Sequence, residues 1–235
     1  MPDKTNGLVQ RMFSEIHATY EVVNHIMTLG LDIVWRKRAA RIAATADGDR
    51  WIDMCTGTGE MVTYLSHLAP KGTKIYAVDF SAPMLEEARM KPGAQPISFI
   101  SSDIKILPFP DESFNLITMS FATRNINISR NVLVQSFTEF HRVLNQGGRF
   151  VNLETSRPPF SPIRIIFDLY IKLFVELIGS RISSSRTPYI YLANTLSSFY
   201  HADELADIMR QAGFGEVTFQ RLFFGAVAIH QAMKL

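Results

Sequence analysis

The chain has 235 residues, a formal net charge of +2 and one cysteine, Cys55. Its length fits one α/β domain with room for an added subdomain, and its small charge, carried by dispersed Lys and Arg, argues against a nucleic-acid-binding face. One cysteine excludes an internal disulfide and is typical of the reducing cytoplasm, where we expect the protein to be.

The hydrophobic share of the sequence, 47%, is high for a soluble enzyme. The N-terminus has no signal-peptide pattern, and no run of about 18 uncharged apolar residues predicts a membrane-spanning helix. We therefore expect the chain to bind something apolar beyond an ordinary core.

The N-terminal region has apolar residues at helical spacing over residues 8–29, which predicts a helix that ends at Gly30. A second short helix is expected from Trp35 to about Ala44. We interpret residues 1–46 as a helical cap that lies outside the sheet.

From Trp51 onward, short apolar runs alternate with helical stretches, which is typical of repeated βα units. The fold class is therefore expected to be α/β, with a doubly wound, mostly parallel, seven-stranded sheet. The expected strands are 50–54, 74–79, 97–101, 114–120, 149–154, 216–221 and 225–233. The expected helices are 59–68, 82–90, 130–144 and 202–212, with Gly147 and Gly148 as a turn before strand 149–154.

Residues 155–200 interrupt the alternation with a helical stretch between Pro162 and Gly179. Its charged residues recur every fourth position, which places them on one stripe and leaves an apolar arc wider than a surface helix needs. The general expectation is burial against the sheet or against a partner in a homodimer. The alternative is a lid over an apolar substrate, or a face that rests on a membrane through 163–178.

The sequence from Trp51 to Glu60 predicts a strand, a tight turn and the start of a helix. Gly57 and Gly59 lack a Cβ, so a ligand can approach the backbone closely. The following helix directs unpaired N–H groups at the turn. Alone, such a turn is a weak signal, because glycine often serves packing only.

Two acidic residues downstream strengthen this interpretation. Strand 74–79 ends in Asp79, whose carboxylate can accept hydrogen bonds from both ribose hydroxyls of a nucleoside. Asp103 follows the next strand, where it can accept from an adenine amino group while Ile104 packs on the ring. The three features together favour a nucleoside-bearing ligand over polar residues that merely end strands.

The choice of ligand depends on the residues after Gly59. A nicotinamide dinucleotide needs a third glycine or a small residue, but the chain continues with Glu60, Met61 and Val62. The negative charge of Glu60 would repel a pyrophosphate and suits the sulfonium and amino group of S-adenosylmethionine (SAM). The charge therefore favours the methyl donor.

Motifs from about residue 9 to the C-terminus resemble those of the ubiquinone/menaquinone biosynthesis C-methyltransferases, which methylate the ring of a prenylated benzoquinol or naphthoquinol. The motifs are Met12-Phe13-Ser14, Tyr20, Asn24, Gly30, Trp35-Arg36-Lys37, Gly57-Thr58-Gly59, Met84-Leu85, Leu107 to Asp111, Ser120-Phe121, Arg124-Asn125, Arg142 to Leu144, Gly147 to Arg149, Leu153-Glu154, Tyr189, Tyr191-Leu192 and Ala228 to His230. The chain departs from the family pattern at Glu21, Glu60, Ala122-Thr123 and Asn194-Thr195, which leaves the quinol open.

The resemblance implies a Rossmann-like methyltransferase fold in one domain, with SAM as methyl donor and no metal. The domain would comprise the cap 1–46, a cofactor-binding core 47–154, a substrate or lid insertion 155–200 and a C-terminal part 201–235. The expected cofactor contacts are Asp53, Thr56, Gly57, Thr58, Gly59, Asp79, Phe80, Met84, Ser102, Asp103, Ile104 and Ser120. The expected substrate contacts are Asn24, Phe121, Glu154, Tyr189, Tyr191 and His230.

The resemblance also implies catalytic roles for Arg124, Tyr20, Asn125 and Glu60. Alignment of a ring carbon with the sulfonium methyl can supply roughly 7–11 kcal/mol, and a quinol hydroxyl must lose its proton to enrich that carbon. Arginine is a poor base, so Arg124 is expected to stabilise the phenolate. Tyr20 would position the hydroxyl or a water, and Asn125 would hold Arg124 or the cap.

For each of two further residues, the sequence allows both a functional and a structural role. His230 is either a proton acceptor or a satisfied core histidine. Glu154 is either a site acid or the structural partner of Arg149.

The alternative functions are a methyltransferase of another small aromatic metabolite and a non-catalytic SAM-binding protein. The expected partner is a lipid quinol at the cytoplasmic face of a membrane, and no nucleic acid.

Overall fold

The computed structural model describes residues 21–22, 24–181, 195–196 and 199–235. A seven-stranded sheet forms its centre, with the strand order β3-β2-β1-β4-β5-β7-β6. Strand β7 runs antiparallel to both of its neighbours, β5 and β6, and the other pairings are parallel. The strands are β1 (Arg50–Met54), β2 (Lys74–Asp79), β3 (Ile97–Ser101), β4 (Phe114–Ser120), β5 (Leu144–Thr155), β6 (Glu216–Leu222) and β7 (Val227–Met233).

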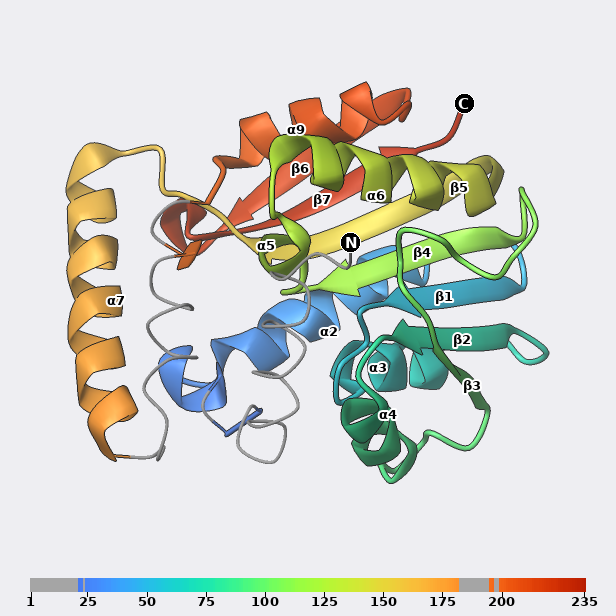
Figure 1. The fold of residues 1–235 in the computed structure, drawn as a ribbon, viewed down its shortest axis with the longest axis horizontal. Coiled ribbons are helices and arrows are strands. Elements are labelled where there is room, and N and C mark those ends of the chain that lie inside the picture. Colours follow the sequence, from blue (N-terminus) through green and yellow to red (C-terminus); the bar gives the residue numbers. More distant parts are fainter. Residues whose placement is uncertain (1–20, 23, 182–194, 197–198) are drawn as a thin grey trace, which may run out of the picture.

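Helices cover both faces of the sheet (Figure 1). They are α2 (Leu31–Ala43), α3 (Glu60–Leu68), α4 (Ala82–Arg89), α5 (Thr123–Ile126), α6 (Arg130–Val143), α7 (Ser161–Arg181) and α9 (Ala202–Gln211), with a 3₁₀ turn η1 (Phe223–Gly225). Helices α6 and α9 pack on one face through Phe137, Phe140 and Leu205, and α2 and α3 pack on the other through Ala39 and Leu65. The two layers bury the apolar runs of β1 and β4 from both sides, as parallel central strands require.

The predicted α/β class and the mostly parallel seven-stranded sheet are confirmed. The first four predicted strands agree with β1 to β4 at both ends. Strand β7 begins two residues later than predicted, because 223–225 form the 3₁₀ turn.

The predicted turn at Gly147 and Gly148 is wrong, because β5 already begins at Leu144. The register jumps from the pair Phe114–Leu144 to the pair Leu116–Arg149, so the glycines form an extended bulge inside β5. The backbone of Lys234 pairs with them, since its C=O accepts from Gly147 N–H at 2.8 Å and its N–H donates to the Gly148 C=O at 3.0 Å. A partner strand far along the sequence thus replaces the turn.

The second N-terminal helix begins at Leu31 and not at Trp35. Gly30 caps it with φ +75°, a left-handed conformation that glycine adopts without steric cost. The early start places Asp32 one turn before Arg36, and the two side chains form a buried ion pair at 2.5 Å.

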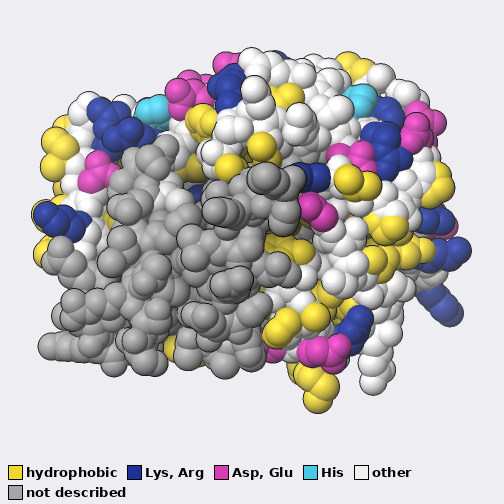
Figure 2. Space-filling view, viewed as in Figure 1, with side chains coloured by type: hydrophobic (Ala, Val, Ile, Leu, Met, Phe, Trp, Pro, Cys, Tyr) yellow, Lys and Arg dark blue, Asp and Glu magenta, His cyan; other side chains and the backbone are white. Residues whose placement is uncertain are grey.

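Helix α7 stands at one end of the molecule, away from the sheet (Figure 1). Of its described side chains, Ile171 is buried, whereas Ile165, Ile166, Leu169 and Leu173 are exposed, so the predicted burial holds only in part. Of the helices in the described ranges, none combines the length and apolar character that a bilayer crossing requires. On the face shown in Figure 2, basic side chains lie among acidic ones along the upper edge.

Candidate active site

Two cavities meet at the carboxyl ends of the parallel strands. The first, called the strand-end cavity, has a volume of about 320 Å³ and is lined by Arg36, Cys55, Thr56, Gly57, Thr58, Glu60, Met61, Asp79, Phe80, Met84, Asp103, Ile104, Lys105, Ser120, Phe121, Ala122, Asn125 and Ile126. The second, called the apolar cavity, has a volume of about 470 Å³ and lies between α2, α7 and η1. Arg36 and Phe121 line both cavities, so the two cavities adjoin at these two side chains.

Most of the predicted cofactor residues line the strand-end cavity. These are Thr56, Gly57, Thr58, Asp79, Phe80, Met84, Asp103, Ile104 and Ser120. Asp53, Gly59 and Ser102 do not line it. A Cβ at Gly57 would meet only Met84 Sδ, at 3.8 Å, so packing leaves room there for close approach by a ligand.

The three remaining residues support the cavity from behind. Asp53 is buried under the turn and accepts hydrogen bonds from the Thr56 and Thr118 hydroxyls at 2.7 and 2.6 Å. Burial raises the pKa of the Asp53 carboxyl to about 7. At Gly59, a Cβ would lie 2.8 Å from the Ala88 Cβ, so this glycine serves the packing of α3 on α4. The Ser102 hydroxyl donates weakly to backbone carbonyls at 3.4 Å.

Asp79 is fixed at the carboxyl end of β2. Its Oδ2 accepts from Gly57 N–H at 2.8 Å and its Oδ1 accepts from Ser81 N–H at 2.9 Å. Burial raises the pKa of the Asp79 carboxyl, and the backbone N–H groups only partly offset this. Each carboxylate oxygen can accept further hydrogen bonds, which leaves Asp79 able to bind hydroxyl groups in the cavity.

Two non-glycine residues that follow parallel strands have left-handed backbones. Cys55 follows β1 with φ +51°, and Phe121 follows β4 with φ +54°. Such conformations cost about 1–3 kcal/mol and cluster at functional sites. The Phe121 ring lies between the cavities and carries the Arg36 guanidinium 4.9 Å from its centroid. The strained backbone thus holds the ring that separates the two cavities.

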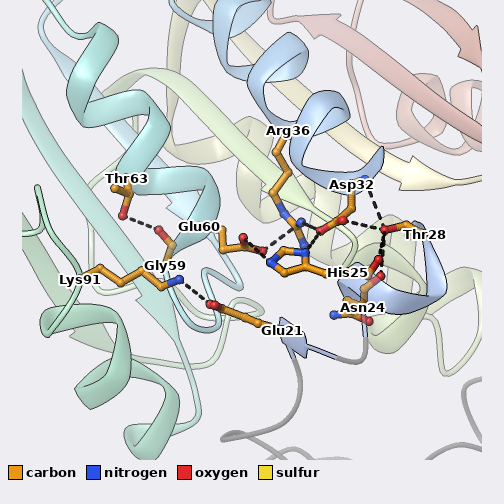
Figure 3. A network of polar contacts seen from close by, with 10 residues as sticks. All are labelled: Glu21, Asn24, His25, Thr28, Asp32, Arg36, Gly59, Glu60, Thr63 and Lys91. Atoms are coloured by element: carbon orange, nitrogen blue, oxygen red, sulfur yellow. Dashed lines mark hydrogen bonds and ion pairs between the residues drawn. The ribbon is translucent and has the colours of Figure 1, made fainter. Parts of the chain in front are cut away.

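A ring of four polar side chains forms part of the same wall (Figure 3). The Nη1 of Arg36 lies 2.5 Å from Asp32 Oδ2 and 2.9 Å from Glu60 Oε2. The Nδ1 of His25 lies 2.8 Å from Asp32 Oδ2, and its Nε2 lies 3.5 Å from Glu60 Oε1. We call Asp32, Arg36, Glu60 and His25 the wall ring.

The two carboxyl groups of the wall ring have opposite pKa shifts. Burial alone would raise the pKa of Asp32, but the Thr28 hydroxyl and the Arg36 guanidinium lower it overall. Burial raises the pKa of Glu60, and Arg36 only partly offsets this. The ion pair with Arg36 also means that Glu60 offers a ligand less free negative charge than the sequence suggested.

The ligand atoms of Glu21, His25 and Glu60 lie within 4.8 Å of one another. Both carboxylates, however, are already paired with a basic side chain. Glu21 lies 2.5 Å from Lys91, and Glu60 pairs with Arg36. Each of these two carboxylates therefore already has a basic partner within ion-pair distance.

Arg124 lies in α5, directly after β4, and lines the apolar cavity with a buried side chain. Its Nη1 is 3.9 Å from Glu154 Oε1 and 3.5 Å from the Thr155 hydroxyl, and its Nε is buried without a hydrogen-bond partner among the described residues. Asn125 lines the strand-end cavity instead. The two neighbours therefore face different cavities.

Glu154 is fully buried in β5 and lines neither cavity. It accepts from the backbone N–H of Arg124 at 3.2 Å. The predicted partnership with Arg149 is wrong, because Arg149 donates to the Thr45 hydroxyl at 2.7 Å. Glu154 thus supports α5 and Arg124.

His230 also lines neither cavity. Its buried ring packs against Phe219, and its Nε2 lies 2.8 Å from the Ala202 carbonyl oxygen. Burial lowers the pKa of His230 to about 4. These contacts fit the interpretation of His230 as a core histidine.

His230 should make the fold sensitive to acid. The folded-state pKa lies below the ordinary value, so stability from the neutral ring is present above about pH 6.5 and lost as the pH falls through about 4. We expect the unfolding free energy of the wild type to fall by about 3 kcal/mol more than that of His230→Gln over this range. Urea unfolding at pH 7 and pH 4 measures the difference, and parallel stability curves would contradict the shift.

The remaining predicted residues divide into two groups. Asn24 and Phe121 line the apolar cavity. Tyr20, Tyr189 and Tyr191 lie outside the described residues.

Sequence reasoning assigned no role to His25, Asp32 or Arg36. The signal that could have found two of them is the i, i+4 spacing of Asp32 and Arg36 next to a glycine.

Comparisons with known proteins identify the family of the chain and its fold. The sequence model of the ubiE/COQ5 methyltransferase family matches residues 1–234. A demethylmenaquinone methyltransferase from Roseiflexus castenholzii is 37% identical over 99% of this chain and 96% of its own length. The ubiquinone/menaquinone biosynthesis C-methyltransferase UbiE of Desulfotalea psychrophila is 32% identical over 96% of this chain and 90% of its own.

Solved structures of methyltransferases share the fold. A SAM-dependent methyltransferase from Thermotoga maritima superposes with a TM-score of 0.66 at 19% identity, over 97% of this chain and 100% of that one.

Proposed function

Because the chain belongs to the ubiE/COQ5 methyltransferase family, we propose that it transfers the methyl group of SAM to a ring carbon of a prenylated quinol in menaquinone or ubiquinone biosynthesis. The observation that carries the proposal is that the strand-end cavity, the more polar of the two, adjoins a larger apolar cavity. The reacting ends of a polar donor and an apolar acceptor would therefore meet beside Arg36 and Phe121, which line both cavities.

The strand-end cavity suits SAM, which supplies an electrophilic methyl group on a sulfonium. Asp79 would accept hydrogen bonds from the ribose hydroxyls, and Asp103 would accept one from the adenine amino group. Ile104 would pack on the adenine ring. Gly57 leaves space for close approach of the ligand. The residues that line the strand-end cavity therefore match the polar groups and the adenine ring of SAM.

The apolar cavity suits the quinol and the start of its prenyl chain. Apolar side chains of α2, α7 and η1 contribute much of its lining. Of the two arginines that line it, Arg36 also lines the strand-end cavity and Arg124 does not. A guanidinium stabilises a phenolate without removing the proton itself. Arg124 would therefore hold the developing negative charge on the acceptor oxygen.

The rim of the apolar cavity supports contact with a membrane surface. Leu29, Ile166, Phe223 and Phe224 line the cavity and are also exposed. A contiguous exposed apolar rim is typical of a protein that receives a lipid or rests on a bilayer. We propose that α7 and this rim touch the membrane while the prenyl chain enters; a homodimer through α7 is the competing arrangement.

Liposome flotation tests the membrane contact. Wild-type protein should float with vesicles of mixed zwitterionic and anionic phospholipids, and Ile165→Glu with Leu169→Glu should abolish flotation, because a buried charge in the interface is costly. Ile165 is 67% exposed, so folding should not suffer. Ile106→Glu is the matched control, since Ile106 is 79% exposed outside the rim. If the wild-type protein does not float with the vesicles, the proposed membrane contact is contradicted.

The function itself is tested by transfer of labelled methyl groups to quinols reduced from demethylated benzoquinone and naphthoquinone extracts. Label in a prenylated quinol is the expected result. Transfer only to small aromatic compounds without a prenyl chain would favour the alternative acceptor, and binding of SAM without any transfer would favour a non-catalytic protein.

A further inference from the structure

The wall ring lies between the two cavities and contacts both. Asp32 lines the apolar cavity, Glu60 lines the strand-end cavity, and Arg36 lines both. His25 closes the ring from the helical residues before α2 (Figure 3). A proton released at the junction of the cavities would thus meet this ring first.

The charges of the wall ring do not balance while His25 is neutral. Two carboxylates face one guanidinium, so the ring carries one net negative charge, and a proton on His25 cancels it. The neighbouring charges are Glu21 and Lys91, which pair with each other at 2.5 Å, and Tyr64, whose hydroxyl stays protonated because burial raises its pKa.

The orientation of His25 suits proton uptake. Asp32 can accept the Nδ1 proton at 2.8 Å, which leaves the Nε2 lone pair directed at Glu60, 3.5 Å away. Hydrogen bonds of this kind are often long before substrate binds. The His25 side chain is 30% exposed, so a proton on it can leave to solvent.

Resting on the proposed function, we propose that Glu60 and His25 form the proton exit of the reaction. The acceptor O–H bond breaks and its proton passes through a water at the junction of the two cavities to the Glu60 carboxylate, because Glu60 lines only the strand-end cavity. The ring carbon then forms a bond to the methyl group while the S–CH₃ electron pair stays on sulfur, and the ring C–H proton replaces the one lost from oxygen. Glu60 gives its proton to His25 Nε2, and His25 gives it to water. One proton leaves per turnover. Asp32 and Arg36 position the pair.

Kinetics of His25→Gln test the relay. We expect kcat to fall about 100-fold, the size typical of proton-transfer catalysis, with the Kd for SAM unchanged. In the wild type, kcat should rise with pH along a limb that His25→Gln lacks. Imidazole added to His25→Ala should restore activity, because the site is open to solvent. His67→Gln, at an exposed histidine near the far end of α3, is the matched control and should behave as wild type.

A retained pH limb, or a loss of kcat that imidazole does not restore, would overturn the relay. A readout without turnover separates this failure from failure of the proposed function. In NMR spectra recorded at one fixed pH, Glu60→Gln should shift the ring nitrogen signals of His25, because Glu60 Oε1 lies 3.5 Å from Nε2. Unchanged His25 ring signals would overturn the coupling even if no quinol were methylated.

Discussion

Arg124→Ala should lower kcat for methyl transfer by about 100- to 1000-fold, the loss typical of removing one donor that stabilises a developing oxyanion. The Kd for SAM should change little, because Arg124 lines the apolar cavity and not the strand-end cavity. Single-turnover transfer from labelled SAM gives the first quantity, and calorimetric titration of SAM gives the second.

The control for Arg124 must separate chemistry from folding. Removal of the guanidinium leaves the fully buried Glu154 without its nearest cation, and an unpaired buried charge is destabilising. Arg124→Lys keeps the charge but loses the fixed fork of donors, so it should fold as wild type and recover only part of kcat. Equal losses of SAM affinity and kcat would refute the assigned role.

Asp79→Asn should weaken SAM binding about 100-fold, since each hydrogen bond to a charged group contributes roughly 1.5–3 kcal/mol. Asn offers one acceptor oxygen where Asp79 offers two, so the substitution also leaves the backbone N–H of Gly57 or Ser81 facing an amide NH2 group, and the unfolding free energy must be measured beside the Kd. At saturating SAM, kcat should stay within a few-fold of wild type, since the ribose contact lies away from the reacting carbon.

Asp207→Asn is the matched control for Asp79→Asn. Asp207 is an exposed carboxylate on α9 that pairs with Arg210 at 2.6 Å, far from the strand-end cavity, and its replacement should leave the Kd for SAM unchanged. An unchanged Kd in Asp79→Asn itself would show that the acid at the end of β2 does not bind the donor.

The two cavities assign different roles to residues that are neighbours in sequence. Arg124 lines the apolar cavity and Asn125 the strand-end cavity, whereas Ser120 lines the strand-end cavity alone and Phe121 lines both. Because α5 is only four residues long, each of its side chains points in a separate direction. A substitution here should therefore affect donor binding or acceptor chemistry separately.

The sequence by itself determined the sheet and most of the strand-end cavity. Apolar runs of five to seven residues define β1 to β4, and parallel strands necessarily bring their carboxyl ends to one edge. Glycine at 57, Asp79 and Asp103 could thus be assigned to one site before any contact was known.

Only the tertiary structure decided the second half of the site. The apolar cavity is assembled from α2, α7 and η1, which lie far apart in sequence and share no local pattern. The wall ring likewise joins α2 to α3 through Arg36 and Glu60, and Glu154 proved to support Arg124 and not Arg149. Local patterns predict strands and turns, because those depend on near neighbours. Which buried charged side chains pair with each other depends on how distant elements pack, and the spacing of apolar residues along the sequence does not specify that packing.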